Sequence, residues 1–185
     1  MKLAVHSTSQ LPFGTKKLLL KYYNFFFPYN DRLPRTHEWL AETGPGRIWF
    51  ILLNGNQIVS NIAVHKRSIK LFNQEFQLAA LGGVFTVVKY QKKGYGSQIV
   101  KHATEYILDP KNNFDVGVLF CAPTRINFYA KNGWKKLNNP SITIFNTQNQ
   151  IIPQQEVTMI RYVSEKSQNM KKDFATQSLF FGETW

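Results

Sequence analysis

The sequence has little cysteine and few acidic residues. Cys121 is the single cysteine among 185 residues, so no disulfide forms within the chain and a reducing compartment, the cytoplasm, is predicted. Asp and Glu total 11 against 23 Lys and Arg, which gives a net charge of +12. A field of that sign attracts anions, among them nucleic acids, anionic membrane surfaces and phosphorylated small molecules.

Long apolar runs and metal-ligand spacings are also missing. The run from Leu18 to Tyr29 is interrupted by Lys21 and Asn24 and ends well short of the roughly 20 residues that span a bilayer. The first residues, 1–6, hold too few apolar side chains for the core of a signal peptide. The four histidines show no spacing typical of a zinc site. We therefore expect neither membrane insertion nor a bound metal.

The composition favours a folded domain. Hydrophobic residues make up 43% and aromatic residues 15% of the chain, which is too apolar for a disordered protein. A chain of this length buries about 70% of its unfolded surface on folding. No internal repeat or low-complexity tract divides it. We expect a single domain over residues 1–185, and the sequence leaves open whether that domain forms a homodimer.

Hydrophobic periodicity predicts a mixed α/β fold. Asn54-Gly55-Asn56 is a hairpin signal, and a second hairpin is expected near Asn73-Gln74. Gly82-Gly83 within a strand predicts a bulge or a close approach to the backbone. The expected helices cover residues 14–27, 37–42, 94–108 and 123–132, and the expected strands cover 47–53, 57–64, 69–71, 75–88, 114–120, 141–145 and 156–162.

A strand that runs through a glycine-containing loop into a helix is the most informative feature. The loop spans Gln91 to Ser97, with glycines at Gly94 and Gly96 and three lysines at or near its start. Its N–H groups and the positive end of the helix dipole converge on one spot, which should hold a phosphate. No acidic residue occurs between Glu75 and Glu105. The loop fits neither a dinucleotide-binding fingerprint nor a Walker loop.

A second motif lies about thirty residues further on, from Phe128 to Trp134. With it, the chain resembles the GNAT acetyltransferase superfamily. Residues 91–96 fit the family's acyl-coenzyme A loop, Gln/Arg-x-x-Gly-x-Gly/Ala, and Phe128-Tyr129 followed by Gly133-Trp134 fit its second motif. The resemblance implies a mostly antiparallel sheet flanked by helices, with acetyl-CoA as the acyl donor.

The resemblance also implies a mechanism of direct transfer to an amine. The pantetheine arm is expected to pair like an added strand with backbone groups of Val84, Phe85 and Thr86. A backbone N–H of that strand then stabilises the oxyanion, and Tyr129 protonates the departing thiolate. The diphosphate is expected on the loop residues Gln91, Lys92, Lys93, Gly94, Tyr95, Gly96 and Ser97.

A closer similarity, over roughly residues 47–185, is to the aminoglycoside 2′-N-acetyltransferases. It is carried by residues 115–119, 129–134, 139–141 and Pro153, and by the chain end Gly182-Glu183-Thr184-Trp185. It implies that Glu156, Glu183 and the α-carboxylate of Trp185 hold the acceptor amine, with Glu156 or that carboxylate as general base. The tail over 163–185 is expected to dock near the acceptor because Leu179, Phe180 and Phe181 are too apolar to remain in water.

The sequence departs from this pattern at two positions. Gly82 stands where the branch carries a glutamate proposed as the general base, and Ala122 replaces an asparagine common in the second motif. The basic excess also steers polycations away, so a neutral or anionic acceptor suits the chain better than an aminoglycoside. The acceptor is therefore expected to be a small-molecule amine of unspecified identity.

Three alternatives remain open at this point. Without the carboxylate at Gly82, the chain is alternatively an acyl-CoA-binding homologue that has lost catalysis. The lysines and aromatic residues alternatively form a basic, stacking face for nucleic acid, although no nucleic-acid-binding motif is present. Cys121 near a strand end invites assignment as a nucleophile, but a lone cysteine is more often a small buried apolar residue.

Overall fold

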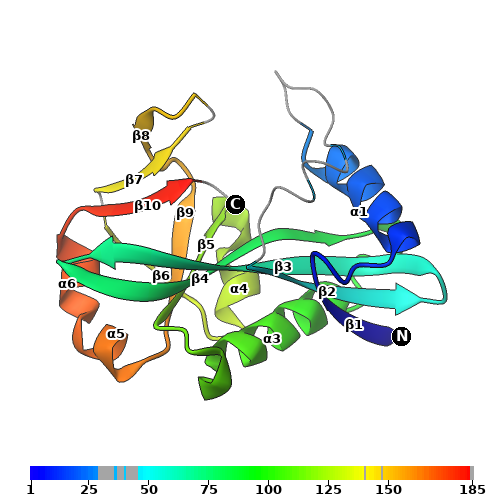
Figure 1. The fold of residues 1–185 in the computed structure, drawn as a ribbon, viewed down its shortest axis with the longest axis horizontal. Helices are drawn as coiled ribbons and strands as arrows, with labels where there is room; N and C mark the ends of the chain where they lie inside the picture. Colours follow the sequence, from blue (N-terminus) through cyan, green and yellow to red (C-terminus); the bar gives the residue numbers. More distant parts are fainter. Residues whose placement is uncertain (29–35, 37–39, 41–45, 140, 147, 184–185) are drawn as a thin grey trace. The chain divides into compact units, whose positions relative to one another are not determined.

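The computed structural model describes residues 1–28, 36, 40, 46–139, 141–146 and 148–183 (Figure 1). The helix expected over 37–42 lies outside these residues except for Leu40. The chain forms two compact units. The first unit comprises Met1–Val64 and Gly83–Ala103, and the second comprises His65–Gly82 and Thr104–Trp185.

The first unit combines strands with one packed helix. Strand β1 (Lys2–Ser7) pairs antiparallel with β2 (Arg47–Asn54), and helix α1 (Phe13–Phe26) lies between them in the sequence. The apolar face of α1, which includes Leu19, Leu20 and Tyr23, packs in a core with Trp49 and Phe85. Strand β1 was not predicted from the sequence, since its alternation of half-buried residues is too short to show a period.

The two hairpins are confirmed, with longer strands than expected. Strand β3 (Gln57–Leu71) is continuous, whereas the sequence predicted separate strands over 57–64 and 69–71. The residues between them alternate between half-buried (His65, Arg67) and exposed (Lys66, Ser68), as in a strand whose outer face meets water. Strand β4 (Gln74–Thr86) follows a turn at Phe72 and Asn73, both of which have positive φ, as a type I′ turn requires.

The central sheet has the strand order β1-β2-β3-β4-β5-β9-β6. Its second-unit members include β5 (Val116–Cys121), β6 (Lys135–Lys136) and β9 (Val157–Tyr162), and β5 pairs antiparallel with β9 along its whole length. Only β4 and β5 pair in parallel in this part of the sheet, over Leu78–Ala80 and Val116–Val118. The predicted mixed, mostly antiparallel α/β fold is confirmed.

A smaller sheet completes the second unit, in the order β10-β7-β8 (Figure 1). Its strands are β7 (Ile142–Phe145), β8 (Ile151–Pro153) and β10 (Leu179–Glu183). Two short helices, α5 (Glu165–Asn169) and α6 (Lys171–Thr176), precede β10. Phe174, Leu179 and Phe181 are fully buried in the core of this unit, so α6 and β10 both contribute side chains to it.

The remaining helices position the chemistry. Helix α3 (Tyr95–Leu108) follows a 3-10 turn, η1 (Val88–Tyr90), and a second such turn, η2 (Pro110–Asn112), follows it. Turn η3 (Pro123–Arg125) leads into α4 (Ile126–Ala130). No helix among the residues described above is both long and apolar enough to cross a bilayer.

Asp115, directly before β5, ties together three segments of the second unit. Its carboxylate accepts hydrogen bonds from the Gln77 N–H (2.8 Å) and the Ser164 hydroxyl (2.7 Å) and pairs with Lys166 (2.8 Å). Partial burial alone would raise the pKa of this carboxyl, but the three donors outweigh it and the pKa is lowered.

Asp115→Ala is expected to reduce the free energy of unfolding by about 1–3 kcal/mol at neutral pH, because it leaves partly buried donors unpaired. A carboxyl with a lowered folded pKa contributes stability above its unfolded pKa of about 3.9 and loses it as the pH falls through the folded value. Urea unfolding at pH 7 and pH 2.5 measures the difference between the two proteins. An equal difference at both pH values would contradict this assignment.

Candidate functional site

The predicted phosphate-binding loop has a backbone shaped by two residues of positive φ. Lys92 has φ +59° and Gly94 has φ +84°, and helix α3 begins directly afterwards at Tyr95. None of the residues that the structure describes has an atom within 4 Å of the position that a Gly94 side chain would occupy. The loop residues Gln91 to Gly94 are exposed, so their N–H groups and the start of α3 are open to an anion.

The charged side chains of this loop, Lys92 and Lys93, are positive, as is the neighbouring Lys89. The first turn of α3 holds no acidic residue, and Lys89 and Lys93 lie 4.9 and 6.0 Å from the ring centre of Tyr90. A hydrogen bond from Asn54 is the main cause that lowers the pKa of the Tyr90 phenol, and these two ammonium groups lower it further. The loop therefore fits a diphosphate in both shape and charge.

The end of β4 is fixed by side chains of its neighbour β3 and of the loop. The Ser60 hydroxyl donates to the Phe85 carbonyl (2.8 Å) and lies 2.9 Å from the Thr86 hydroxyl, and the Gln91 amide donates to the Thr86 carbonyl (2.9 Å). The Val87 N–H donates to Val59 (2.9 Å). Since main-chain groups alternate between the two edges of a strand, those of Val84 and Thr86 face away from β3.

In the second unit, the parallel register between β4 and β5 ends early. It covers Leu78–Ala80 against Val116–Val118, while β5 continues to Cys121 in register with β9 alone among the described strands. The family resemblance predicted a strand that splays from the next one. Within the second unit, the parallel pairing is limited to three residues of each strand.

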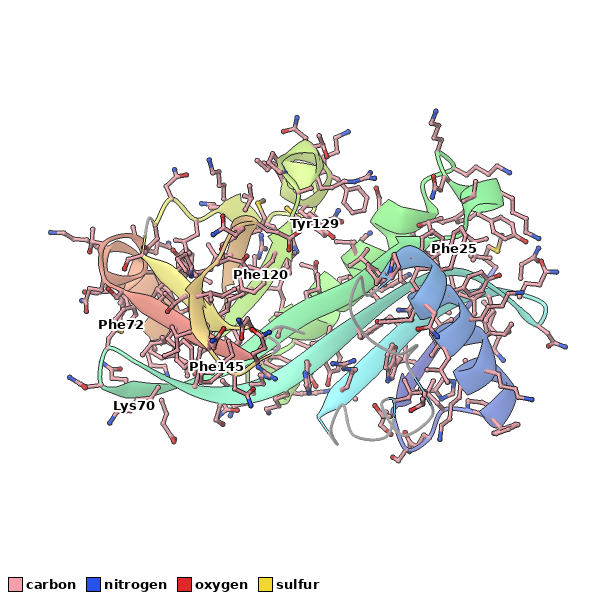
Figure 2. The ribbon with its side chains drawn as sticks, turned by 90° about the horizontal axis from the view of Figure 1, so that it is seen from above. Phe25, Lys70, Phe72, Phe120, Tyr129 and Phe145 are labelled. Carbon is pink, nitrogen blue, oxygen red and sulfur yellow. The ribbon has the colours of Figure 1, made fainter. Side chains whose placement is uncertain are left out.

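Tyr129, on α4 (Figure 2), is 7% exposed, and the charges of Cys121, Arg125 and Glu156 act on its phenol. Burial is the largest cause that raises the pKa of its phenol, the Cys121 and Glu156 side chains raise it further, and Arg125 opposes them. The phenol is therefore protonated throughout the neutral range, as a general acid must be.

Cys121 ends β5 opposite Val157 and is buried and free. Burial, with Glu156 as a smaller cause, raises the pKa of its thiol. A nucleophilic cysteine needs a lowered pKa, so this environment disfavours that role. The described residues contain no group of three or more His, Cys, Asp or Glu side chains placed to hold a metal ion.

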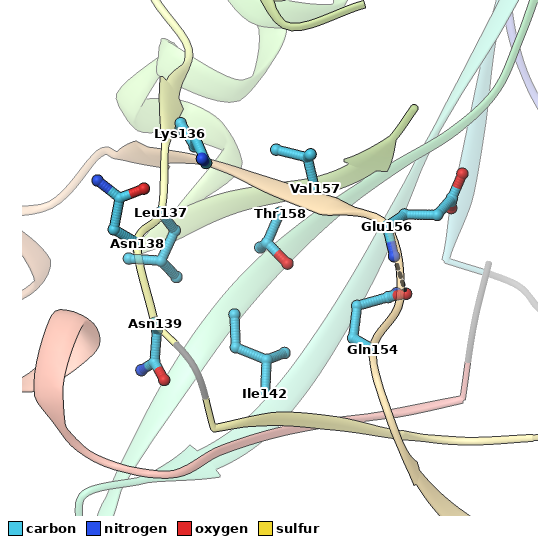
Figure 3. Close-up of a pocket in the computed structure, with 9 residues that line it drawn as sticks. All are labelled: Lys136, Leu137, Asn138, Asn139, Ile142, Gln154, Glu156, Val157 and Thr158. Atoms are coloured by element: carbon cyan, nitrogen blue, oxygen red, sulfur yellow. Dashed lines mark hydrogen bonds between the residues drawn. The ribbon is translucent and has the colours of Figure 1, made fainter. Parts of the chain in front are cut away.

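Glu156, directly before β9, lines an open pocket of about 420 Å³ in the second unit (Figure 3). The pocket has an apolar floor that includes Leu137, Ile142 and Val157 and a polar rim that includes Lys136, Asn138 and Gln154. The Glu156 N–H donates to the Gln154 side chain (2.9 Å), which fixes the bend where β9 begins. The Glu156 carboxylate can pair with an ammonium group of a ligand, and Lys136 and the amide side chains can bind an anionic or uncharged group.

The structure describes the predicted tail as far as the end of β10. Leu179 and Phe181 are fully buried, and β10 pairs in parallel with β7. Trp185, named as a candidate acceptor ligand, lies outside the described residues, and of Glu183 only the backbone is described.

A cluster of polar residues around Gly83 was not predicted from the sequence. Ser60 and Asn61 are both fully buried on β3, and Tyr23 of α1 lies against Gly83. A signal for it is present, because Ser-Asn interrupts the apolar run Ile58-Val59 to Ile62-Ala63. The expectation of a close approach at Gly82-Gly83 is confirmed, since a side chain at Gly83 would overlap the Tyr23 hydroxyl.

The chain is similar to known acetyltransferases in sequence profile and in fold. The sequence profile described as an acetyltransferase (GNAT) domain matches residues 20–137. No curated protein sequence matches the chain. Among solved structures, the Escherichia coli GNAT family N-acetyltransferase YhbS in complex with CoA superimposes with a TM-score of 0.64 at 11% identity, covering 91% of this chain and 86% of its own.

Two further structures share the fold at similarly low identity. Escherichia coli ElaA gives a TM-score of 0.61 at 15% identity, covering 87% of this chain and 99% of its own. An aminoglycoside 6′-N-acetyltransferase complexed with coenzyme A gives 0.59 at 13% identity, covering 87% and 97%.

Proposed function

Because the chain belongs to the GNAT family of acetyltransferases, which take acetyl-CoA as the acyl donor, we propose that it transfers the acetyl group directly to the amine of a small molecule. The observation that carries this proposal is the exposed loop from Gln91 to Gly94 at the start of α3, which carries Lys92 and Lys93 and no acidic residue. A diphosphate is the part of acetyl-CoA that such a loop recognises.

Each unit is assigned its own part of the reaction. In the first unit, residues Gln91 to Ser97 hold the diphosphate, and the main-chain groups of Val84 and Thr86 bind the pantetheine arm as an added strand would. Acetyl-CoA supplies an activated thioester carbonyl. A backbone N–H of the 84–86 segment stabilises the oxyanion that develops on that carbonyl, which is worth about 3–4 kcal/mol for comparable donors.

In the second unit, Tyr129 donates its phenolic proton to the thiolate as the carbon–sulfur bond breaks. Because its pKa is raised, the phenol carries that proton at neutral pH when the thiolate departs. Glu156 takes the proton that the attacking nitrogen loses as the new carbon–nitrogen bond forms. Glu183 is a further candidate to hold the amine.

The pocket beside Glu156 suggests the class of acceptor. It combines one carboxylate with one ammonium group, from Lys136, and several amides. A polycation such as an aminoglycoside gains little from this mixture and is repelled by the net charge of +12. A monoamine that also carries a neutral or anionic polar group fits better.

The test is the release of free thiol from acetyl-CoA, measured with a panel of amines. The panel contains aminoglycosides, polyamines, amino acids and peptides. Faster release with amino acids or short peptides than with polyamines supports the proposed acceptor class. Coenzyme A binding without thiol release for any amine would favour a catalytically inactive homologue. Salt-dependent DNA binding without coenzyme A binding would favour the nucleic-acid alternative.

Glu156→Gln is expected to lower kcat/KM for the best amine by about tenfold or more, because the amide cannot accept the proton. Coenzyme A affinity should stay within twofold of the wild type, since Glu156 is not assigned to the donor. Glu165→Gln, an exposed glutamate at the start of α5, is the matched control. Equal kcat/KM for Glu156→Gln and the wild type would remove Glu156 as the base.

A further inference from the structure

The Tyr23 hydroxyl occupies the place of a side chain on β4. Gly83 has φ +60°, and the atom that any other residue would carry there would overlap the Tyr23 hydroxyl and approach its ring carbon. Tyr23 is 5% exposed and is held by edge-to-face contacts with Trp49 (5.7 Å) and Phe85 (6.0 Å). Helix α1 therefore delivers a polar group to β4 at the residue next to Gly82, where the sequence itself supplies none.

Asn61 fixes the same residue from β3. Its side-chain amide donates to the Gly83 carbonyl at 3.0 Å, and the side chain is fully buried. Its Oδ1 atom has no hydrogen-bond partner among the described residues. An apolar side chain would avoid that desolvated oxygen, so packing alone does not explain an amide at this position.

Ser60 provides a second attachment two residues further along β4. Its hydroxyl donates to the Phe85 carbonyl at 2.8 Å. Successive residues of a strand project from opposite faces, so Ser60 and Asn61 reach β4 from the two faces of the sheet. The two carbonyls that accept these bonds, of Gly83 and Phe85, lie on the edge of β4 that faces β3. Because main-chain groups alternate between the two edges of a strand, the N–H and C=O of Val84 face the opposite edge.

We propose that Tyr23 and Asn61 are positioning residues that hold the bend at Gly83 and so aim the main-chain donors of residues 84–86 at the acyl group. The kinetic part of this inference rests on the proposed function, whereas the conformational part does not. Oxyanion donors act only when they are fixed before the reaction, so a loosened bend lowers the rate of transfer more than the affinity for the donor.

Amide hydrogen exchange tests the conformational part. Tyr23→Phe removes the hydroxyl alone, and Asn61→Leu removes the bond at nearly constant volume. Both are expected to accelerate exchange of the amides of Phe85 and Val87, whose N–H groups face β3, by about tenfold, with β9 unaffected. Tyr22→Phe makes the same change on the half-buried neighbouring residue and should leave these amides unchanged. Rates within twofold of the wild type in both variants would overturn the proposal.

Steady-state kinetics test the positioning part. In Tyr23→Phe, kcat is expected to fall about tenfold while the Kd for coenzyme A stays within twofold. A lower melting temperature with unchanged kcat would show that Tyr23 only fills the core, and would overturn the positioning role. If the wild type releases no thiol with any amine, the proposed function fails, while the exchange experiment still decides whether Tyr23 and Asn61 hold the bend.

Discussion

Tyr129→Phe is expected to lower kcat by about 100-fold, within the range by which general acid catalysis accelerates reactions. The phenol is buried, and burial, Cys121 and Glu156 raise its pKa above the ordinary value of 10.0. The departing thiolate therefore meets a protonated donor at every pH from neutral to about 10. Phenylalanine fills the same space without a proton, so coenzyme A affinity should change little.

The measurement is thiol release at saturating donor and amine, together with calorimetry for coenzyme A. Tyr162→Phe is the matched control, because burial also raises the pKa of that phenol, on β9, where it packs on Phe174. The wild type should show no loss of kcat up to about pH 10 from deprotonation of the acid. Equal kcat for Tyr129→Phe and the wild type would make Tyr129 a packing residue.

The sequence was most informative where local chemistry decides the backbone. The Asn54-Gly55 hairpin, the helix that starts after Gly94 and the strand before Cys121 all follow from turn residues and short-range periodicity. The loop motif, which needs only one strand, one turn and one helix, could be placed on the same basis. Proposed roles for its residues remain predictions.

The elements that were not predicted from the sequence are held by partners far away along the chain. Strand β1 is held by β2, some forty residues away, and β10 by β7, so neither carries enough local signal to be predicted. The same holds for Tyr23. Its apolar spacing assigned it to the helix core, and only the approach of Gly83 from β4 shows that its hydroxyl has a specific place.

The missing glutamate at Gly82 illustrates the same limit. Residues 82 and 83 of β4 are both glycine, so this part of the strand carries no polar side chain. The sequence alone therefore suggests either that catalysis has been lost or that another segment of the chain supplies the base. Within the first unit, polar groups reach the adjacent residue Gly83 from two other elements instead: the Tyr23 hydroxyl from α1 and the Asn61 amide from β3.

Gly94→Val is expected to weaken coenzyme A binding by at least about 100-fold. Residue 94 has φ +84°, a conformation that a β-branched residue adopts only with strain. The open space above Gly94 is also the space assigned to the diphosphate, so the valine side chain would displace the phosphate oxygens from the N–H groups of the loop. Both effects act on the donor and neither acts on the amine.

Isothermal calorimetry with coenzyme A measures the effect, and Gly182→Val separates strain from obstruction. Gly182 has a similar φ of +72° and only the far end of Arg67 nearby, at 4.0 Å, but it lies on β10 in the second unit. Both variants should lose stability, whereas only Gly94→Val should lose coenzyme A affinity. If Gly94→Val binds coenzyme A with the same affinity as the wild type, the diphosphate is held by some other part of the chain.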